Sequence, residues 1–444
     1  MKKLLIHGGS VVTDTTIERQ DILLSVTGEI EEIHPKIPEK HGEEFLDAAG
    51  LLIFPLLIDC HVHFREPGLE HKATMETEAR AALAGGVGTV CEMPNTDPPT
   101  VTIAALADKI RRASKIAGCV IKFFFGVTED AHLHALRELW TGTSMELKRM
   151  KHHCAGVKVF FDHSTGNQKV TADLAGEVFK VCGELKIPLV AHCEDPGINQ
   201  TSARNQKPET RNIALHSLMR PPESEAVAIE RAIGLAQKCQ TPLHIAHLST
   251  TQGVALVRAA KKSGVSVTCE VTPHHLFLTT DDYEELGTLG KMNPPLRTPD
   301  HRTALWEGIA DGTVDCVATD HAPHLLAEKK VADPLSAPSG VPGVETMLPL
   351  LLTVAAGQSP QPNQKLKTKN QQLSYSDIVR LCFTNPNRIF SLGQDGIQKK
   401  AHARLVIIDP SVSSVITPVN LRSKCGWTPY EGWETTGKIL RTVQ

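Results

Sequence analysis

Histidine and aspartate side chains stand at the ends of several short apolar runs of the sequence. His61 and His63 follow the run at residues 56–60, and three further runs end in His192, His247 and Asp320. Residues i and i+2 of a strand point to the same face, so His61 and His63 can bind one metal ion together. A single pair of this kind is more often two ordinary histidines at a strand end. Four histidines and a carboxylate at four run ends indicate a metal centre instead.

The ligand types predict which metal this centre takes. Imidazole and carboxylate groups without a thiolate suit zinc or a divalent ion of similar hardness. These ligands outnumber what one catalytic zinc ion usually takes from protein, so we expect two zinc ions that share a bridging ligand. The run at residues 157–161 offers two candidates for the bridge. Lys158 can form a carbamate with CO₂ if burial lowers its pKa, whereas Asp162 can ligate directly, and the residues alone leave both open.

The spacing of the apolar runs predicts the scaffold that positions these side chains. Eight runs are bounded by polar, Gly or Pro residues, at 56–60, 89–93, 119–125, 157–161, 189–191, 243–246, 266–271 and 315–318. Stretches with helical periodicity lie between them, for example at 77–84, 103–116, 172–185, 223–238 and 251–262. Apolar strands that alternate with helices indicate a parallel sheet covered by helices. Eight such units predict an α/β fold, a (β/α)₈ TIM barrel with its active site at the C-terminal ends of the strands. A doubly wound open sheet is the weaker alternative.

Both ends of the chain have strand character without intervening helices. Short strands are expected at residues 4–12, 22–26 and 30–33, and strand texture returns at 404–408. We therefore expect residues 1–50 and 393–444 to form one small β-sandwich-like domain built from both termini, beside a barrel at residues 51–392.

Composition argues against several other classes of protein. The 444 residues carry 47 Lys and Arg against 50 Asp and Glu, a net charge of −3, so no nucleic-acid partner is expected. The longest apolar runs are shorter than the roughly 18 residues that a membrane span needs, so no membrane association is expected. The apolar stretch at the N-terminus is short, so no export signal is expected there. Eleven scattered cysteines without a CxxC pair predict reduced thiols in a cytoplasmic protein.

The other histidines are expected to have no part in the metal centre. Those in polar or helical contexts are expected at the surface, namely His34, His41, His132, His134, His152, His153, His301 and His402. His244 and His275 lie beside stronger candidates and are expected to be structural.

Several longer motifs resemble a known family. They are HVHFREPG at 61–68, MPNT at 93–96, VAHCED at 190–195, HIAHLST at 244–250, KMNPPLR at 291–297, TDHAPH at 319–324, SGVPGVE at 339–345 and CGWTP at 425–429. Together they resemble the amidohydrolase superfamily, and HxHFREPG combined with MPNT is selective for its dihydroorotases. The resemblance covers nearly the whole chain.

The resemblance implies a zinc hydrolase that interconverts N-carbamoyl-L-aspartate and L-dihydroorotate in pyrimidine biosynthesis. Its ligand sets are His61, His63 and Asp320 for the first zinc ion and His192 and His247 for the second. Carboxylated Lys158 matches the bridge, and Asp162 is the alternative that some dihydroorotases use. A bridging hydroxide would attack the ring amide while Asp320 acts as general base and acid.

The resemblance also implies a substrate pocket. The carboxylate would contact Arg65, whose planar guanidinium suits it, together with Asn95 and His324. His63 is a further substrate-binding residue. The ring amide would contact Asn293, Ser339 and Gly340. Allantoinase and dihydropyrimidinase are the nearest alternatives, because they share the metal core, but their uncharged rings need no arginine. A non-catalytic scaffold that binds aspartate transcarbamoylase is the alternative of another class, and family habit predicts a homodimer.

Overall fold

A parallel barrel occupies the middle of the chain in this computed structural model, which describes residues 2–162, 168–206, 212–361 and 373–444. Its strands are β6 (Leu57–Val62), β7 (Val87–Glu92), β8 (Val120–Gly126), β9 (Cys154–Phe160), β10 (Leu189–His192), β11 (Leu243–Ile245), β12 (Val267–Val271) and β13 (Cys316–Val317). Each strand pairs with the next in parallel register. The ring closes where Val62 bridges His321 and the His63 amide donates to the His321 carbonyl at 2.8 Å. The predicted (β/α)₈ barrel is confirmed.

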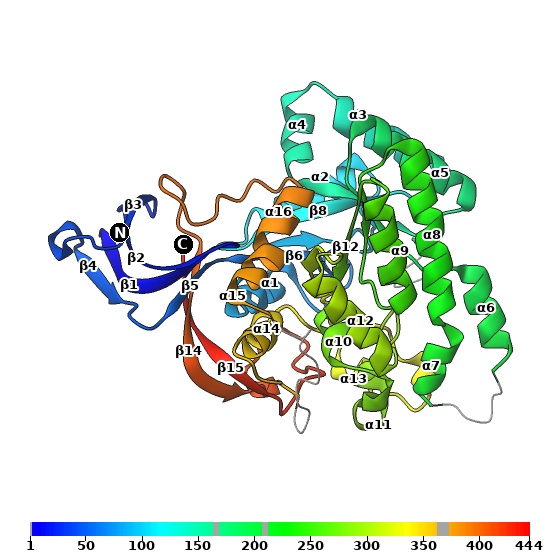
Figure 1. The fold of residues 1–444 in the computed structure, drawn as a ribbon. Coiled ribbons are helices and arrows are strands. Elements are labelled where there is room, and N and C mark those ends of the chain that lie inside the picture. The colour runs from blue at the N-terminus through cyan, green and yellow to red at the C-terminus, as the bar shows by residue number, and fades with distance from the viewer. Residues whose placement is uncertain (1, 163–167, 207–211, 362–372) are drawn as a thin grey trace.

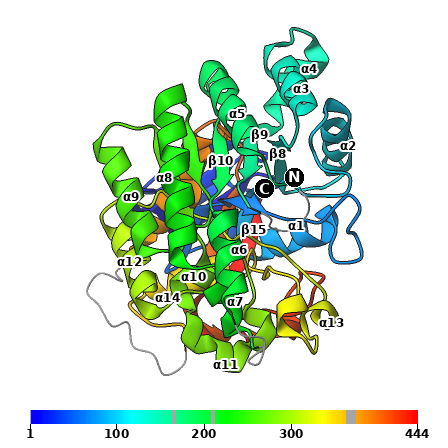
Figure 2. The same ribbon diagram turned by 90° about the vertical axis from the view of Figure 1, so that its right-hand side faces the viewer.

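Helices cover the outside of these strands (Figures 1 and 2). The longer ones are α1 (Met75–Ala84), α2 (Ile103–Ala113), α3 (Asp130–Thr141), α4 (Met145–His152), α5 (Ala172–Leu185), α8 (Pro222–Cys239), α9 (Thr251–Lys262), α12 (Pro299–Ala310) and α14 (Met347–Ala355). Threonine begins four of them, because the hydroxyls of Thr74, Thr102, Thr171 and Thr250 each accept a backbone N–H of the first turn. These caps fix where each helix leaves its preceding loop.

Short helices interrupt the connections between the longer elements. They are α6 (Pro196–Arg204), α7 (Ala214–Met219), α10 (Pro273–Phe277), α11 (Tyr283–Leu286), α13 (Leu326–Lys329), α15 (Tyr375–Val379) and α16 (Asn385–Ile389). Among the described residues, no helix combines the length and the apolar character that a membrane span requires.

One mixed sheet joins the two termini, as predicted. Its strands are β1 (Leu4–Val12), β2 (Ile17–Leu24), β3 (Ile30–His34), β4 (Glu44–Asp47), β5 (Leu52–Pro55), β14 (Leu405–Val415) and β15 (Glu434–Val443). In Figure 1 this sheet lies beside the barrel, with blue N-terminal and red C-terminal strands together. Strand β5 joins the two chain ends, because it pairs in parallel with β1 and antiparallel with β14. The exact limits of the two units stay a prediction.

Small apolar side chains and thiols fill the barrel interior. Cys60, Cys91 and Cys316 pack there, and Phe390 contacts Phe124 edge to face at 5.5 Å. All eleven cysteines are free, and most are buried. A tightly packed interior leaves the strand ends as the place for chemistry.

Candidate metal centre and substrate pocket

The predicted ligands meet at the C-terminal ends of the barrel strands. His63 Nε2 lies 2.9 Å and His61 Nε2 3.3 Å from the same oxygen of Asp320. On the neighbouring strands, His192 Nδ1 lies 2.9 Å from His247 Nε2, and the ring centres of His61 and His247 are 5.3 Å apart. All of these side chains are buried. Ligand atoms of His61, His247 and Asp320 lie close enough together to hold one ion.

Three residues of this region have a left-handed backbone that non-glycine residues seldom adopt. The φ angles are +69° for Arg65, +34° for His247 and +46° for Asp320. Such conformations cost about 1–3 kcal/mol each and persist where the surrounding structure holds them. The strained positions coincide with candidate ligands and the candidate substrate arginine, which supports a functional reading of this end of the barrel.

Lys158 and Asp162, the two candidate bridges, differ in what surrounds them. The Lys158 Nζ is buried and has no hydrogen-bond partner among the described residues. Burial lowers the pKa of Lys158 to about 8. In contrast, Asp162 accepts a 2.7 Å hydrogen bond from the Asn199 amide and lies 3.7 Å from Arg220. A buried lysine with no acceptor and a lowered pKa fits a carbamate bridge, because only the neutral amine reacts with CO₂. The imidazole and carboxylate donors of this site fit a divalent metal ion.

Two buried carboxylates that the sequence analysis did not assign lie behind the histidines. Glu270 on β12 accepts from His61 Nδ1, from His244 Nε2 at 3.1 Å and from the His247 amide at 3.2 Å. Metal-binding histidines commonly donate their second ring nitrogen to a carboxylate in this way, which fixes the tautomer. The signal was available, since Glu270 is the one charged residue of an otherwise uncharged strand, Val267–Val271.

Glu194 plays the corresponding part for His192. Its carboxylate lies 2.8 Å from His192 Nε2 and also binds the Arg220 guanidinium. Although burial would raise the pKa of Glu194, Arg220 and His192 hold it well below its ordinary value. Its position two residues after His192, where strand β10 ends, was the available signal.

The predicted carboxylate-binding residues form a cationic pocket beside the metal ligands. Arg65 is buried, donates from Nε to the Pro323 carbonyl at 3.0 Å and lies 3.1 Å from His324 Nε2. Burial lowers the pKa of Arg65 to about 10. In the described ranges no acidic side chain forms an ion pair with it. Asn95 lies 2.7 Å from His63 Nδ1 and so links this pocket to a candidate metal ligand.

The predicted ring-amide contacts line a small cavity at the strand ends. Asn293, Ser339 and Gly340 line it together with Phe160 and the candidate metal ligands. His216, which the sequence analysis did not single out, lies 2.9 Å from the Asn293 carbonyl oxygen and orients that side chain. The structure thus brings every predicted site residue to one end of the barrel.

Two histidines differ from their predicted surface positions. His132 and His301 are buried. His132 Nδ1 accepts from the Thr128 amide, and His301 Nδ1 accepts from the Thr251 amide. Each imidazole thus accepts a backbone hydrogen bond inside the fold, and the polar sequence around the histidine does not predict this.

The family model for amidohydrolases matches residues 52–443, nearly all of the chain. The chain belongs to the amidohydrolase family.

Relatives of this amidohydrolase include dihydroorotases and hydantoinases. A dihydroorotase of Halobacterium salinarum is 40% identical over 395 residues, which cover 88% of this chain and 85% of that protein. A dihydroorotase of Staphylococcus epidermidis is 36% identical over 441 residues, covering 99% and 97%. Among solved structures, the L-hydantoinase (dihydropyrimidinase) of Arthrobacter aurescens superposes with a TM-score of 0.89 at 26% identity, covering 100% of this chain and 94% of that one. The amidohydrolase is an enzyme, a hydrolase that acts on cyclic amides.

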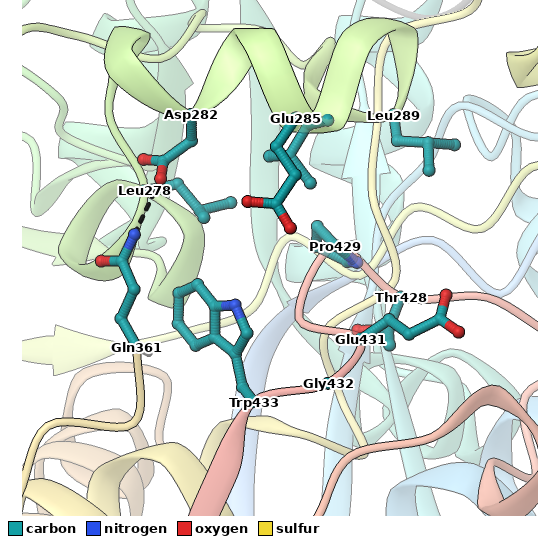
Figure 3. Close-up of a pocket in the computed structure, with 11 residues that line it drawn as sticks. Leu278, Asp282, Glu285, Leu289, Gln361, Thr428, Pro429, Glu431, Gly432 and Trp433 are labelled. Carbon is teal, nitrogen blue, oxygen red and sulfur yellow. Dashed lines mark hydrogen bonds between the residues drawn. The ribbon is translucent and has the colours of Figure 1, made fainter. Parts of the chain in front are cut away.

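A second cavity of the amidohydrolase lies away from the histidines (Figure 3). Trp433 and Leu278 provide apolar surface, and Gln361 donates to Asp282 at 2.7 Å across it. Among the described residues, its lining includes carboxylates but no histidine or cysteine.

Proposed function

We propose that the enzyme is a dihydroorotase, which interconverts N-carbamoyl-L-aspartate and L-dihydroorotate in pyrimidine biosynthesis. The observation that carries this proposal is the buried Arg65 beside the candidate metal ligands, without an acidic partner in the described part of the chain. A buried guanidinium is costly unless an anion pairs with it, and the carboxylate of a cyclic amide substrate is such an anion. The identity to two dihydroorotases over most of the chain supports the same substrate.

The proposed cofactor is a pair of zinc ions. His61, His63 and Asp320 would hold one, and His192 and His247 the other, with carboxylated Lys158 between them. The unpartnered Lys158 amine supports this bridge over Asp162, whose carboxylate already binds Asn199. When bound, such ions lower the pKa of water and polarise a carbonyl, which supplies a nucleophile and an electrophile at neutral pH.

Asp320 would move the proton. Although burial opposes ionisation, His61 and His63 hold the pKa of Asp320 well below its ordinary value, so it is a carboxylate at neutral pH. In ring opening it would accept the proton of the attacking water and return it to the departing amide nitrogen. In ring closure the same group would take the proton from the attacking nitrogen and deliver it to the departing hydroxide, which leaves as water.

The other residues would bind and orient the substrate. Arg65, His324 and Asn95 would hold the carboxylate, and Asn293 with the Ser339 and Gly340 backbone would hold the ring amide. Fixing the carboxylate at one end of the ring would place the scissile amide over the metal ligands. The entropy cost of orienting the substrate is then met on binding, before the chemical step.

The test of this function is ring opening of L-dihydroorotate by zinc-loaded protein with bicarbonate, with hydantoin and allantoin as parallel substrates. Turnover of dihydroorotate alone is expected. Turnover of an uncharged ring instead would favour a hydantoinase-type activity, to which the structural likeness to the Arthrobacter aurescens enzyme points. No turnover with two metals bound would favour the scaffold that binds aspartate transcarbamoylase.

Lys158→Ala tests the bridge. This variant should lose activity and one metal, and short carboxylic acids should restore part of both, because they replace the missing carbamate. Full activity without added acid would overturn the carbamate and favour Asp162. We also expect a cytoplasmic homodimer; the free, mostly buried cysteines support a reducing compartment.

A further inference from the structure

His324 lies among four polar groups, of which Lys72 and Ser339 define where its proton is. The Lys72 ammonium is 3.0 Å from Nδ1, while the Ser339 carbonyl oxygen is 3.0 Å from Nε2. Arg65 Nη2 is 3.1 Å from the same Nε2. The Glu328 carboxylate is 3.9 Å from Nδ1, beyond hydrogen-bond distance. The ring is almost fully buried, so water does not replace these partners.

The chemistry of the first two partners leaves one tautomer. An ammonium group only donates, so Nδ1 must offer its lone pair to Lys72. A carbonyl oxygen only accepts, so Nε2 must carry the proton that is donated to Ser339. Both contacts independently require the neutral imidazole with its proton on Nε2. Arg65 also only donates, so its 3.1 Å contact with Nε2 is the one contact that this tautomer leaves unsatisfied.

We propose that Lys72 is a positioning residue that fixes His324 as a neutral Nε2–H donor for the substrate carboxylate. The inference rests on the proposed function, in which His324 and Arg65 bind that carboxylate. Ser339 lines the cavity that also contains the candidate metal ligands, so the Nε2 edge of the ring faces the substrate side. When an anion enters beside Arg65, the same N–H can turn from the Ser339 carbonyl to the carboxylate oxygen.

Lys72 is itself held in place from the other side. Its Nζ lies 3.2 Å from Glu328 Oε1, and Glu328 Oε2 accepts the Leu325 amide at 2.9 Å. Glu328 thereby balances the charge of Lys72 and fixes the direction of the ammonium. The side chains form a chain from Glu328 through Lys72 to His324, and no member of that chain is a candidate metal ligand.

The surrounding charges keep the imidazole neutral. Burial first, and then the nearby cations Arg65, Lys72 and Lys329, hold the pKa of His324 far below its ordinary value. A neutral N–H donor beside a permanent cation suits an anionic oxygen, because it adds a hydrogen bond without a second charge to desolvate. Without Lys72, Nδ1 loses its donor, and the ring can exchange tautomers or turn over.

The test uses ¹⁵N-histidine-labelled holoenzyme and its nitrogen chemical shifts, which distinguish protonated from unprotonated ring nitrogens. His324→Asn identifies the His324 signals. Wild type should show an unprotonated Nδ1 and a protonated Nε2. Lys72→Met should show mixed or reversed protonation of His324. The matched control is Lys330→Met, the same change at an exposed lysine six residues after His324, which should leave the signals unchanged.

Kinetics supply the second measurement. Loss of one hydrogen bond to a charged group corresponds to roughly a 10- to 150-fold increase in KM for dihydroorotate, with kcat nearly unchanged, in Lys72→Met. A changed tautomer together with raised KM supports the proposal. An unchanged tautomer in Lys72→Met overturns it, and raised KM in that case assigns Lys72 to direct substrate contact. If wild type turns over no dihydroorotate, the proposed function fails, while the tautomer measurement still decides the role of Lys72.

Discussion

Glu270→Gln is the substitution with the sharpest expected effect, because it removes one charge and almost no volume from the centre of the barrel. The carboxylate accepts four contacts: from His61 Nδ1, the His247 amide, His244 Nε2 and the Cys60 thiol. None of these contacts involves substrate. They hold the proton of His61 on Nδ1 and leave its Nε2 lone pair toward the metal site.

The magnitude follows from counting donors. A glutamine amide keeps one accepting oxygen and replaces the other by a donating NH₂ group. In either orientation, two of the four donors then face another donor inside the protein. Each unsatisfied buried group costs about 1–3 kcal/mol, so Glu270→Gln should lower the free energy of unfolding by about 2–6 kcal/mol. Loss of a carboxylate behind a metal-binding histidine should also weaken metal affinity roughly 10- to 100-fold.

Thermal unfolding of the metal-free protein and zinc titration against a competing chelator measure the two effects separately. Glu307→Gln on α12 is the control, since this glutamate is exposed and undergoes the same chemical change. It should match wild type in both measurements. If Glu270→Gln binds zinc with wild-type affinity and unfolds at the wild-type temperature, Glu270 does not position His61 and the donor count is wrong.

Three other changes test the rest of the site. At fixed CO₂, carboxylation of Lys158 in metal-free protein should increase as the pH rises through about 8, because the pKa of Lys158 is lowered from 10.5 to about 8 and only the neutral amine reacts. ¹³C NMR with labelled bicarbonate measures the carboxylated fraction. A fraction that does not change with pH would contradict this prediction. Arg65→Gln should raise KM for dihydroorotate roughly 10- to 150-fold, because it removes a charge-assisted hydrogen bond, and metal binding should be retained. Steady-state kinetics and metal analysis check this. An unchanged KM would show that Arg65 does not bind the substrate. Glu194→Gln should weaken one of the two proposed zinc sites roughly 10- to 100-fold, because a neutral amide replaces the carboxylate that accepts from His192. Equal loss at both sites in a chelator titration would refute that link.

The barrel and five of the six candidate ligands were predictable because they follow from local sequence, whereas the choice of Lys158 came from the family resemblance. A strand buried on both faces is a continuous apolar run, and the polar residue that ends it lies at the barrel mouth. The run at 189–191 followed by His192 is such a case, and strand β10 spans Leu189–His192. One local pattern therefore predicts both the element and its chemistry.

Partners that come from distant elements were not predictable in the same way. Glu270 meets His61 across more than two hundred residues of sequence, and Glu194 meets Arg220 only because α7 ends beside β10. The burial of His132 and His301 likewise depends on backbone amides presented by the fold. The polar sequence around these residues predicts an exposed position, whereas tertiary contacts make them buried.

Buried carboxylates hold the chain beside two candidate ligands that have a strained backbone. Beside His247, Glu225 on α8 accepts both the amide and the hydroxyl of Ser249 and of Thr250. Beside Asp320, Asp59 accepts the amide and the hydroxyl of Thr319.

Each carboxylate thus fixes the chain next to a residue with positive φ, and the hydrogen bonds offset the conformational cost at that residue. A ligand held in this way keeps its direction before any ion or substrate arrives, which is what a preorganised site requires. The apolar runs of the sequence therefore mark where the ligands are, while the buried acids determine how those ligands point.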